Sequence, residues 1–410
     1  MDFSMADFVE LAHGFLVNLQ ETARKTPPHI LFLALLSAIV SSLILLYALI
    51  YLLAPTPRAP HPSEKTYITT TPAGPVCSQA LPCWHDGWLA HRRDAAAGKG
   101  DAKHTGSIEG PEIMMSVVVP AYNEEERMEI MLEEAVEFLD AEYGRSPLED
   151  TQQKGEKEIN RGIGGYEILI VNDGSKDKTI DVAMAFSRKH KLHDVLRVCT
   201  LQQNRGKGGA VTHGFRHVRG AYTVFADADG ASKFGDLRKL VKGCQKVEDK
   251  QGRGIAVGSR AHMVGTEAVV KVLLPPPLLS LFPHITNSNP PPPQRSALRN
   301  ALMHSFHLLL RLLTPPATSR IRDTQCGFKL FSRAALPHIV PYMHAEGWIF
   351  DVEMLMLAES APDGINVAEV QIGWQEVGGS KLNVVWDSLA MAWGLAILRA
   401  SWIVGVYRRR

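Results

Sequence analysis

The chain has 410 residues, of which 45% are hydrophobic, and its 44 basic and 43 acidic side chains nearly cancel. This size supports one large domain with appendages and a sizeable core. The balanced charge gives no support to nucleic-acid binding, which normally uses a basic surface. Five scattered cysteines, without metal-ligand spacing, favour free thiols, with a Cys77–Cys83 bridge as the alternative.

One segment near the N-terminus is long and apolar enough to span a membrane. Residues 1–28 resemble a short amphipathic lead-in, and no charged residue occurs from Ile30 to Leu53. At about 1.5 Å per helical residue, such a segment crosses a hydrocarbon layer of roughly 30 Å. We therefore predict an uncleaved transmembrane anchor at 29–54. The alternative, a cleaved signal peptide, normally has a shorter apolar run and a small-residue cleavage site close behind it.

The composition changes twice after the anchor. Residues 55–112 are rich in Pro, Gly, Ala and His without a sustained period, which predicts a linker or stalk. Across 113–383, apolar strands alternate with helical stretches, which predicts an α/β fold with a mostly parallel, doubly wound sheet. Two insertions, near 144–165 and in the proline-rich stretch 273–295, are predicted to be flexible surface excursions.

Two later helical segments combine apolar side chains with arginines. One is Ser296–Leu313, and the other, 384–410, carries three tryptophans and ends in three arginines. Arg399 argues against a full membrane span by the second segment. Tryptophans and terminal arginines are typical of helices in the lipid headgroup layer, so both segments are predicted to be membrane-interface helices. Ordinary core packing is the alternative for both.

Four polar blocks follow predicted strands in order along the α/β region. They are Pro120-Ala-Tyr-Asn-Glu124, Asn172-Asp-Gly-Ser175, the glycine-rich Asn204–Ala210 before a helix, and Asp227-Ala-Asp229. Because parallel strands end at one edge of a sheet, the four blocks should surround one crevice. Two carboxylates one residue apart can hold a divalent cation that bridges the protein to a diphosphate. An isolated Asp-x-Asp is weak evidence, and the order of the four blocks makes it informative.

These blocks resemble the inverting nucleotide-sugar transferases with the Rossmann-like GT-A fold, and within them the dolichyl-phosphate β-glucosyltransferases of the eukaryotic endoplasmic reticulum. The resemblance covers about residues 116–400 and also rests on the strings Ala226–Phe234, Val257–His262, Asp323–Lys329, Gly347–Glu353 and Gly379–Asn383. It implies a single-pass membrane enzyme of the endoplasmic reticulum whose catalytic domain faces the cytosol. Such an enzyme transfers glucose from UDP-glucose to dolichyl phosphate, gives the β product by inversion, and uses Mg²⁺ or Mn²⁺.

The resemblance also implies roles for donor-side residues. Pro120, Tyr122 and Glu124 would contact the uridine, and Asp173 would accept the N–H of uracil. Helix capping is the alternative role for Asp173. Lys207 would supply positive charge near the nucleotide.

Asp227 and Asp229 would hold the metal and the nucleotide, with Asp229 among the catalytic residues. Mannosyl relatives often carry Gln where this chain has Ala231, so a further ligand position falls to water or the diphosphate.

A lipid phosphate is the acceptor in this interpretation. Its second pKa is about 6, so it is largely ionised at cytosolic pH and needs cationic positioning more than a strong base. The candidate cations are Arg260, Arg320, Arg322, Lys329 and Lys381, with Arg260 and Lys381 also assigned to catalysis. Asp351, also assigned to catalysis, would border the donor sugar and contact its hydroxyls or act as a base.

Two other functions stay open from the sequence. A dolichyl-phosphate mannosyltransferase using GDP-mannose would share the Asp-Ala-Asp and Gly379–Asn383 strings. The Gly230-Ala-Ser-Lys233 continuation and the Gln325–Lys329 string weigh against it. A membrane-tethered scaffold without catalysis is the second alternative, although unpaired charged groups are costly to retain without a function.

Overall fold

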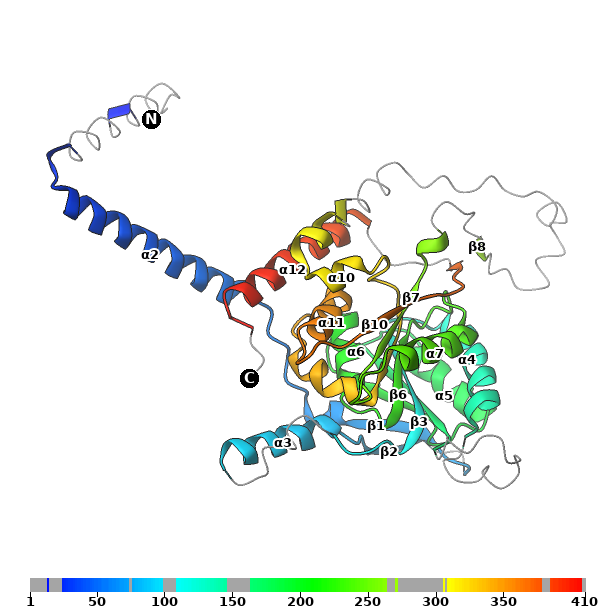
Figure 1. The fold of residues 1–410 in the computed structure, drawn as a ribbon. Helices are drawn as coiled ribbons and strands as arrows, with labels where there is room; N and C mark the ends of the chain where they lie inside the picture. Colours follow the sequence, from blue (N-terminus) through cyan, green and yellow to red (C-terminus); the bar gives the residue numbers. More distant parts are fainter. Residues whose placement is uncertain are drawn as a thin grey trace, which may run out of the picture. The chain divides into compact units, whose positions relative to one another are not determined.

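A computed structural model describes the chain in segments: residues 13–14, 24–73, 76–98, 108–145, 163–263, 270–271, 305–306, 308–377 and 384–407. The chain divides into two units. One comprises Met1–Ala54 and Ala400–Arg408, and the other comprises Pro55–Arg399 with the last two residues. Figure 1 labels the helices and strands of the chain.

The first unit contains one long apolar helix, α2 (Pro28–Leu53). Proline is tolerated at its first turn because the N–H that proline lacks would have no helical partner there. Its length and composition are sufficient to cross a membrane, and its most apolar window is not buried within the protein. Its extent agrees with the predicted anchor.

The second unit is built on a nine-stranded sheet with the order β10-β7-β9-β6-β3-β4-β5-β1-β2. Its strands are β1 (Thr66–Thr70), β2 (Val76–Ala80), β3 (Ile113–Ala121), β4 (Tyr166–Asn172), β5 (Leu196–Thr200), β6 (Gly220–Ala226), β7 (Ile255–Ser259), β9 (Phe328–Ser332) and β10 (Val367–Gln371). The central strands β6, β3, β4 and β5 are parallel, as are β7 and β10. Strand β9 runs antiparallel between β6 and β7, and β1 and β2 form an antiparallel edge. The α/β, GT-A-like prediction is therefore confirmed, but the sheet is mixed rather than mostly parallel.

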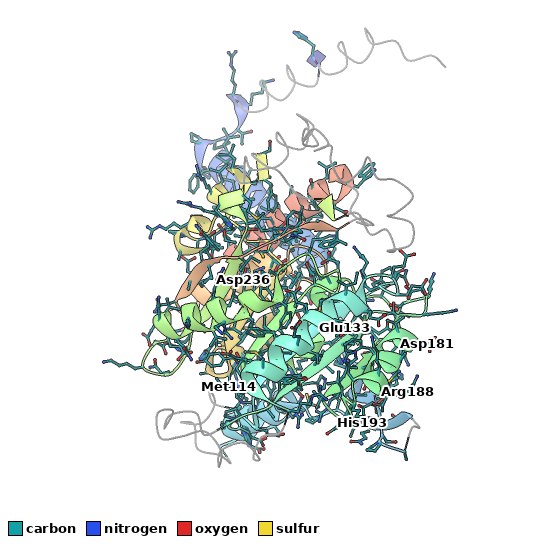
Figure 2. All side chains as sticks on the ribbon, turned by 90° about the vertical axis from the view of Figure 1, so that its right-hand side faces the viewer. Met114, Glu133, Asp181, Arg188, His193 and Asp236 are labelled. Atoms are coloured by element: carbon teal, nitrogen blue, oxygen red, sulfur yellow. The ribbon has the colours of Figure 1, made fainter. Side chains whose placement is uncertain are left out.

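Helices cover both faces of the sheet because alternate side chains of its central strands are buried on opposite sides. Val117 and Val119 of β3 belong to a core shared with α4 (Met128–Tyr143), α5 (Thr179–Lys189) and α7 (Leu237–Val247). Val118 points the other way, toward α6 (Lys207–Phe215), where a Cβ on Gly214 would come within 2.5 Å of its side chain. Helices α4 and α5 lie next to each other, joined by a Lys189–Glu133 ion pair (Figure 2).

The segment 55–112 differs from the predicted linker. It contains a 3-10 turn η1 (Pro62–Lys65), strands β1 and β2, and helix α3 (Trp84–Ala96). Strand β1 pairs with β5, and the Thr69 hydroxyl donates to the carbonyl of Leu196. Short edge strands, such as the threonine-rich β1, lack a strong apolar period, so composition alone did not reveal them.

The remaining elements are short, except for two C-terminal helices. They are η3 (Phe234–Asp236), η4 (Ala261–Met263), α10 (Pro316–Arg320), η5 (Arg333–His338), η6 (Val340–Tyr342), α11 (Phe350–Glu359), α12 (Val384–Ile403), and a small parallel pair of β8 (Val270–Lys271) with β11 (Glu376–Val377). Most of both predicted insertions and most of Ser296–Leu313 lie outside the described residues. Among the cysteines, Cys83 is a free thiol, in agreement with the favoured prediction.

Candidate functional site

The loops that follow β3 and β4 are hydrogen-bonded to each other. Asn123 has a left-handed backbone with φ 55°, its N–H donates to the Ser175 hydroxyl at 2.9 Å, and its side-chain oxygen accepts from the Lys176 N–H at 2.7 Å. Tyr122, 37% exposed, lies beside this turn. The predicted uridine-contacting loop is therefore held to the Asp173 loop by the backbone N–H and the side-chain oxygen of Asn123.

Glu124 lies in this loop but points to an arginine. Its carboxylate accepts two bonds from Arg127, at 2.8 and 2.6 Å, and a guanidinium nitrogen of Arg127 is 3.9 Å from Asp229. Arg127 thus connects the first block to the Asp-x-Asp, and sequence reasoning missed it. Its position three residues after Glu124 could have indicated an ion pair between the two side chains.

Asp173 fastens the glycine-rich loop to the end of β4. Its carboxylate accepts the backbone N–H of Arg205 at 2.7 Å and of Gly206 at 2.9 Å. Glycine is required at 206 because φ is +83° and a Cβ would lie 2.7 Å from the Glu346 carbonyl oxygen. Burial raises the pKa of Asp173 to about 6. The Asp173 carboxylate thus binds the loop before α6 and caps neither α5 nor α6. Each carboxylate oxygen has two lone pairs, so these two bonds leave capacity for a further donor.

Asp227 and Asp229 follow β6 directly. A carboxylate oxygen of Asp227 is 2.5 Å from the Lys207 ammonium, and the Asp227 N–H donates to the carbonyl of Gly327 at 3.2 Å. A Cβ on Gly327 would lie only 2.0 Å from Asp227 Oδ2, so this glycine leaves the space that the carboxylate occupies. Burial, and then repulsion from Asp227, raise the pKa of Asp229.

The donor set at this strand end suits a cation that arrives with a diphosphate. In the described part of the chain, no group of three or more His, Cys, Asp or Glu residues could hold a metal ion. Mg²⁺ is usually bound by one or two carboxylates plus substrate phosphates and water, rather than by a complete protein cage. Asp227 and Asp229 fit that pattern, and Ala231 adds no side-chain ligand.

Asp351 lies in the first turn of α11 and forms a buried ion pair with Lys329, whose ammonium also donates to the Cys326 carbonyl at 2.7 Å. Burial raises the pKa of Asp351, against the opposing effect of the Lys329 charge. Glu353, two residues later on the same helix, does not share the partner of Asp351. Its carboxylate accepts hydrogen bonds from the backbone N–H groups of His344 and Ala345. The predicted contact of Lys329 with the acceptor phosphate conflicts with this placement, because Lys329 is fully buried.

Arg260 follows β7 and is held by Asp323. Its guanidinium donates twice to that carboxylate, at 2.8 and 2.9 Å, and lies over the ring of Trp374. Burial alone would raise the pKa of Asp323, but the bonds and charge of Arg260 lower it. Arg320 and Arg322 are exposed near the chain segment that carries Asp323, and Lys381 lies outside the described residues.

Five of the predicted residues form one electrostatic cluster: Lys207, Asp227, Asp229, Arg260 and Asp351. Burial opposes the charge on Lys207, but Asp227, Asp351 and Asp229 together raise its pKa. Burial likewise opposes the charge on Arg260, but the charges of Asp323 and Asp227 help to raise its pKa. The Lys207 ammonium lies 5.8 Å from the ring centroid of Trp348, a residue of a noted string that received no role from the sequence. The strand ends thus combine carboxylates for a cation with fixed positive charge for an anionic leaving group.

The chain is similar to several characterised glycosyltransferases. Residues 116–260 match the family described as glycosyl transferase family 2. The dolichyl-phosphate β-glucosyltransferase of Saccharomyces cerevisiae is 40% identical over 92% of this chain and 94% of its own length. The enzyme of the same description from Homo sapiens is 38% identical over 76% of this chain and 82% of its own. Glucosyl-3-phosphoglycerate synthase from Mycobacterium tuberculosis, crystallised with Mn²⁺, UDP-glucose and phosphoglyceric acid, aligns over 70% of this chain and 80% of its own at 17% identity, with a TM-score of 0.41.

Proposed function

Because this chain belongs to the dolichyl-phosphate β-glucosyltransferases, and so transfers glucose to dolichyl phosphate, we propose that UDP-glucose is its donor and that transfer inverts the anomeric carbon. The observation that carries the proposal is the Asp227–Asp229 pair at the end of β6, in one charge cluster with Lys207. The relatives do not favour a mannosyltransferase or an inactive scaffold, since they are glucosyltransferases by description.

The leaving diphosphate is the group that this cluster suits. Asp227 and Asp229 would hold Mg²⁺ or Mn²⁺, which supplies Lewis-acid stabilisation of charge on the departing diphosphate. Lys207, held in place by Asp227, would add a fixed positive charge, and Arg127 is close enough to Asp229 to do the same. The bond from the anomeric carbon to the UDP oxygen breaks, and its electron pair leaves with UDP.

Uridine recognition falls to the interlocked loops after β3 and β4. The uracil N–H donates to Asp173, whose carboxylate is already oriented by the two backbone N–H groups of the glycine-rich loop. Pro120 and Tyr122 contact the nucleoside, and the exposed Tyr122 ring offers a surface for stacking. Two backbone N–H groups and the uracil N–H would together favour the ionised form of Asp173, because the protonated form has less acceptor capacity.

The acceptor needs positioning rather than deprotonation, because its phosphate is already an anion near neutral pH. Arg260, fixed by Asp323, and the exposed Arg322 are the described cations that suit this role, and Lys381 remains a proposed third. Asp351 acts as a positioning residue through its pair with Lys329 and its charge on Lys207. An oxygen of the lipid phosphate forms the new bond on the face of the sugar opposite UDP.

A membrane location suits the lipid acceptor. Helix α2 is the single proposed span, in the endoplasmic reticulum membrane, with the catalytic unit in the cytosol. The free thiols of Cys83, Cys199, Cys244 and Cys326 support a reducing compartment. On α12, Trp386 and Trp393 are 71% and 61% exposed, whereas Leu395 is buried, which supports an interfacial role for one face of this helix.

The decisive experiment is a competition assay. The purified full-length protein in detergent, supplied with dolichyl phosphate, is offered UDP-glucose, UDP-N-acetylglucosamine and GDP-mannose together. We expect only dolichyl β-glucosyl phosphate, with activity lost in EDTA, restored by Mg²⁺ or Mn²⁺, and abolished by Asp229→Asn. Mannosyl product, or full activity in chelator, would contradict the proposal.

A further inference from the structure

Arg260 has one edge of its guanidinium group free. Its Nε and Nη2 atoms donate to the two carboxylate oxygens of Asp323, at 2.8 and 2.9 Å. Its Nη1 atom donates to no group among the described residues and is not one of their buried unpaired atoms, so it is open to solvent. The N–H groups of Nη1 and the remaining N–H of Nη2 form a fork that matches two oxygens of a phosphate.

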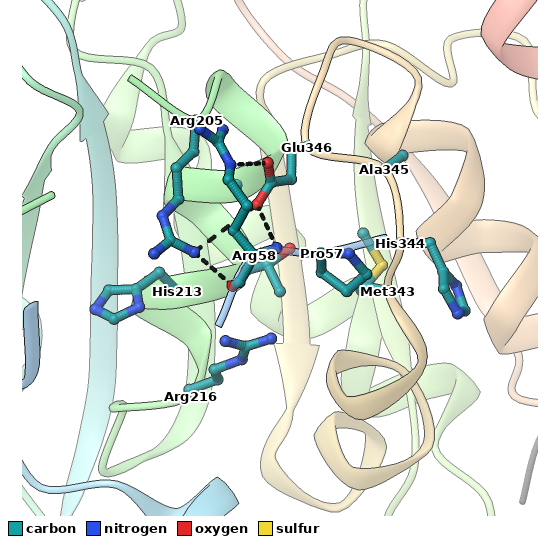
Figure 3. Close-up of a pocket in the computed structure, with 11 residues that line it drawn as sticks. Pro57, Arg58, Arg205, His213, Arg216, Met343, His344, Ala345 and Glu346 are labelled. Carbon is teal, nitrogen blue, oxygen red and sulfur yellow. Dashed lines mark hydrogen bonds and ion pairs between the residues drawn. The ribbon is translucent and has the colours of Figure 1, made fainter. Parts of the chain in front are cut away.

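Arg205, beside α6, shows the contrasting arrangement. Its Nη1 atom donates to the carbonyl of Arg58, and its Nη2 atom donates to the Glu64 carboxylate. Glu346 pairs with both Arg205 and Arg58 (Figure 3). Both ends of the Arg205 fork therefore join segments of the protein to each other, whereas Arg260 is held along one edge only and its side chain is 33% exposed.

The ring of Trp374 lies against the face of the Arg260 guanidinium. The guanidinium carbon is 5.5 Å from the ring centroid, within the range of about 6 Å for a cation–π contact. The two hydrogen bonds to Asp323 still allow the group to tilt about the edge that they hold, and a ring against its face restricts that tilt. The direction of the free edge therefore depends on Trp374.

The backbone on either side of Trp374 is bonded to two loops of the candidate site. The Gln375 N–H donates to the carbonyl of Ala231 at 2.8 Å, in the loop that follows the Asp-x-Asp. The Ile372 N–H donates to the carbonyl of Ser259, the last residue of β7, at 3.2 Å. These bonds fix where the ring lies, and they do not involve the Trp374 side chain.

We propose that Trp374 is a positioning residue that directs the free edge of Arg260 toward the phosphate of the acceptor. This inference rests on the proposed function, in which Arg260 binds that phosphate. The Asp323 carboxylate offsets the charge of Arg260, so the free edge contributes directed hydrogen bonds more than net charge. Hydrogen bonds weaken steeply when donor and acceptor are misaligned, and the plane of the guanidinium therefore affects acceptor binding.

The test compares KM values for dolichyl phosphate and UDP-glucose, measured with the full-length protein in detergent. Trp374→Leu should raise the KM for dolichyl phosphate about 3- to 10-fold. The KM for UDP-glucose and the Mg²⁺ requirement should stay near the wild-type values, because the backbone bonds to Ala231 and Ser259 remain. Trp374→Phe keeps an aromatic face and should recover most of the loss. Gln375→Ala, at the exposed neighbouring position, is the control and should keep the wild-type KM values.

A double-mutant cycle with Arg260→Lys shows whether Trp374 acts through Arg260. Lysine keeps the charge opposite Asp323 but has no planar group to orient, so adding Trp374→Leu should not raise the KM for dolichyl phosphate further. A wild-type KM for dolichyl phosphate in Trp374→Leu, or two effects that multiply in the double variant, would overturn the inference. The proposed function fails in a different way, if the wild type forms no dolichyl β-glucosyl phosphate from UDP-glucose.

Discussion

Replacing Gly327 with alanine tests whether the position of the Asp227 carboxylate controls catalysis. The new Cβ would lie 2.0 Å from Asp227 Oδ2 and 2.4 Å from its Cγ, far inside the ordinary contact distance of about 3.5 Å. The Asp227 side chain is 32% exposed and can rotate away, at a cost of about 1 kcal/mol in rotamer strain. Rotation also breaks its 2.5 Å pairing with Lys207.

Misplacing one charged group that stabilises a transition state typically lowers kcat by about 10²–10³, or roughly 3–4 kcal/mol. We therefore expect Gly327→Ala to lose at least about 100-fold in kcat/KM and to need more Mg²⁺ for half-maximal rate. Its Tm should fall by only about 1–3 °C. Initial rates are measured against UDP-glucose and Mg²⁺, and Tm by intrinsic fluorescence.

The matched control is Gly235→Ala, because a Cβ there would meet only Phe138, at 3.8 Å, within the described residues. The same chemical change without crowding should leave activity near the wild-type level. Wild-type kcat/KM and Mg²⁺ dependence in Gly327→Ala would refute the reasoning, as would an equal loss in Gly235→Ala.

Three further predictions concern the buried pair, pH and the membrane. Lys329→Met should lower the free energy of unfolding, measured by urea titration, by about 3–5 kcal/mol, because it leaves Asp351 buried and unpaired. The double variant Lys329→Met/Asp351→Leu should regain most of the lost stability without regaining activity. Asp173, whose pKa rises from 3.8 to about 6 on folding, binds its proton more tightly in the folded chain, so its contribution to stability falls as pH rises from about 4 to 6. Asp173→Asn should remove that fall, by up to about 3 kcal/mol, and in the wild type the KM for UDP-glucose should rise below about pH 6. A truncated protein beginning at Pro55 should float with anionic liposomes. Replacing both Trp386 and Trp393 with Ser in that protein should remove most of the binding. If the truncated protein without these substitutions does not float, α12 is not a membrane-interface helix.

A truncated protein must begin before β1, because the segment after α2 belongs to the sheet. Beginning at Glu112, as the predicted linker would suggest, removes β1 and β2 from the sheet. It also removes Glu64, the buried partner of Arg205, next to the glycine-rich loop. A linker prediction rests on missing periodicity, and a short edge strand gains its stability from the neighbouring strand rather than from its own pattern.

Some residues of the candidate site could be predicted from the sequence, and others could not. Asp227, Asp229, Asp173 and Lys207 were predictable because each directly follows or precedes a strong strand or helix signal, and parallel strands bring such ends together. The partners Arg127 and Asp323 received no role, although both lay in or near noted strings. A charge acquires its partner from the three-dimensional arrangement, and nothing local to Asp323 specifies Arg260, 63 residues earlier.

The sequence by itself determined the long apolar helix α2, the central parallel strands and the edge at which the polar blocks meet, because apolar runs and glycine-rich turns act over a few residues. Only the tertiary structure decided that β9 enters antiparallel between β6 and β7, which brings Gly327 against Asp227. It also decided that Lys329 is buried on Asp351 instead of exposed to a lipid phosphate. Burial and pairing depend on segments far apart in the chain, and their energies are set by the packed environment rather than by the residue's own neighbours.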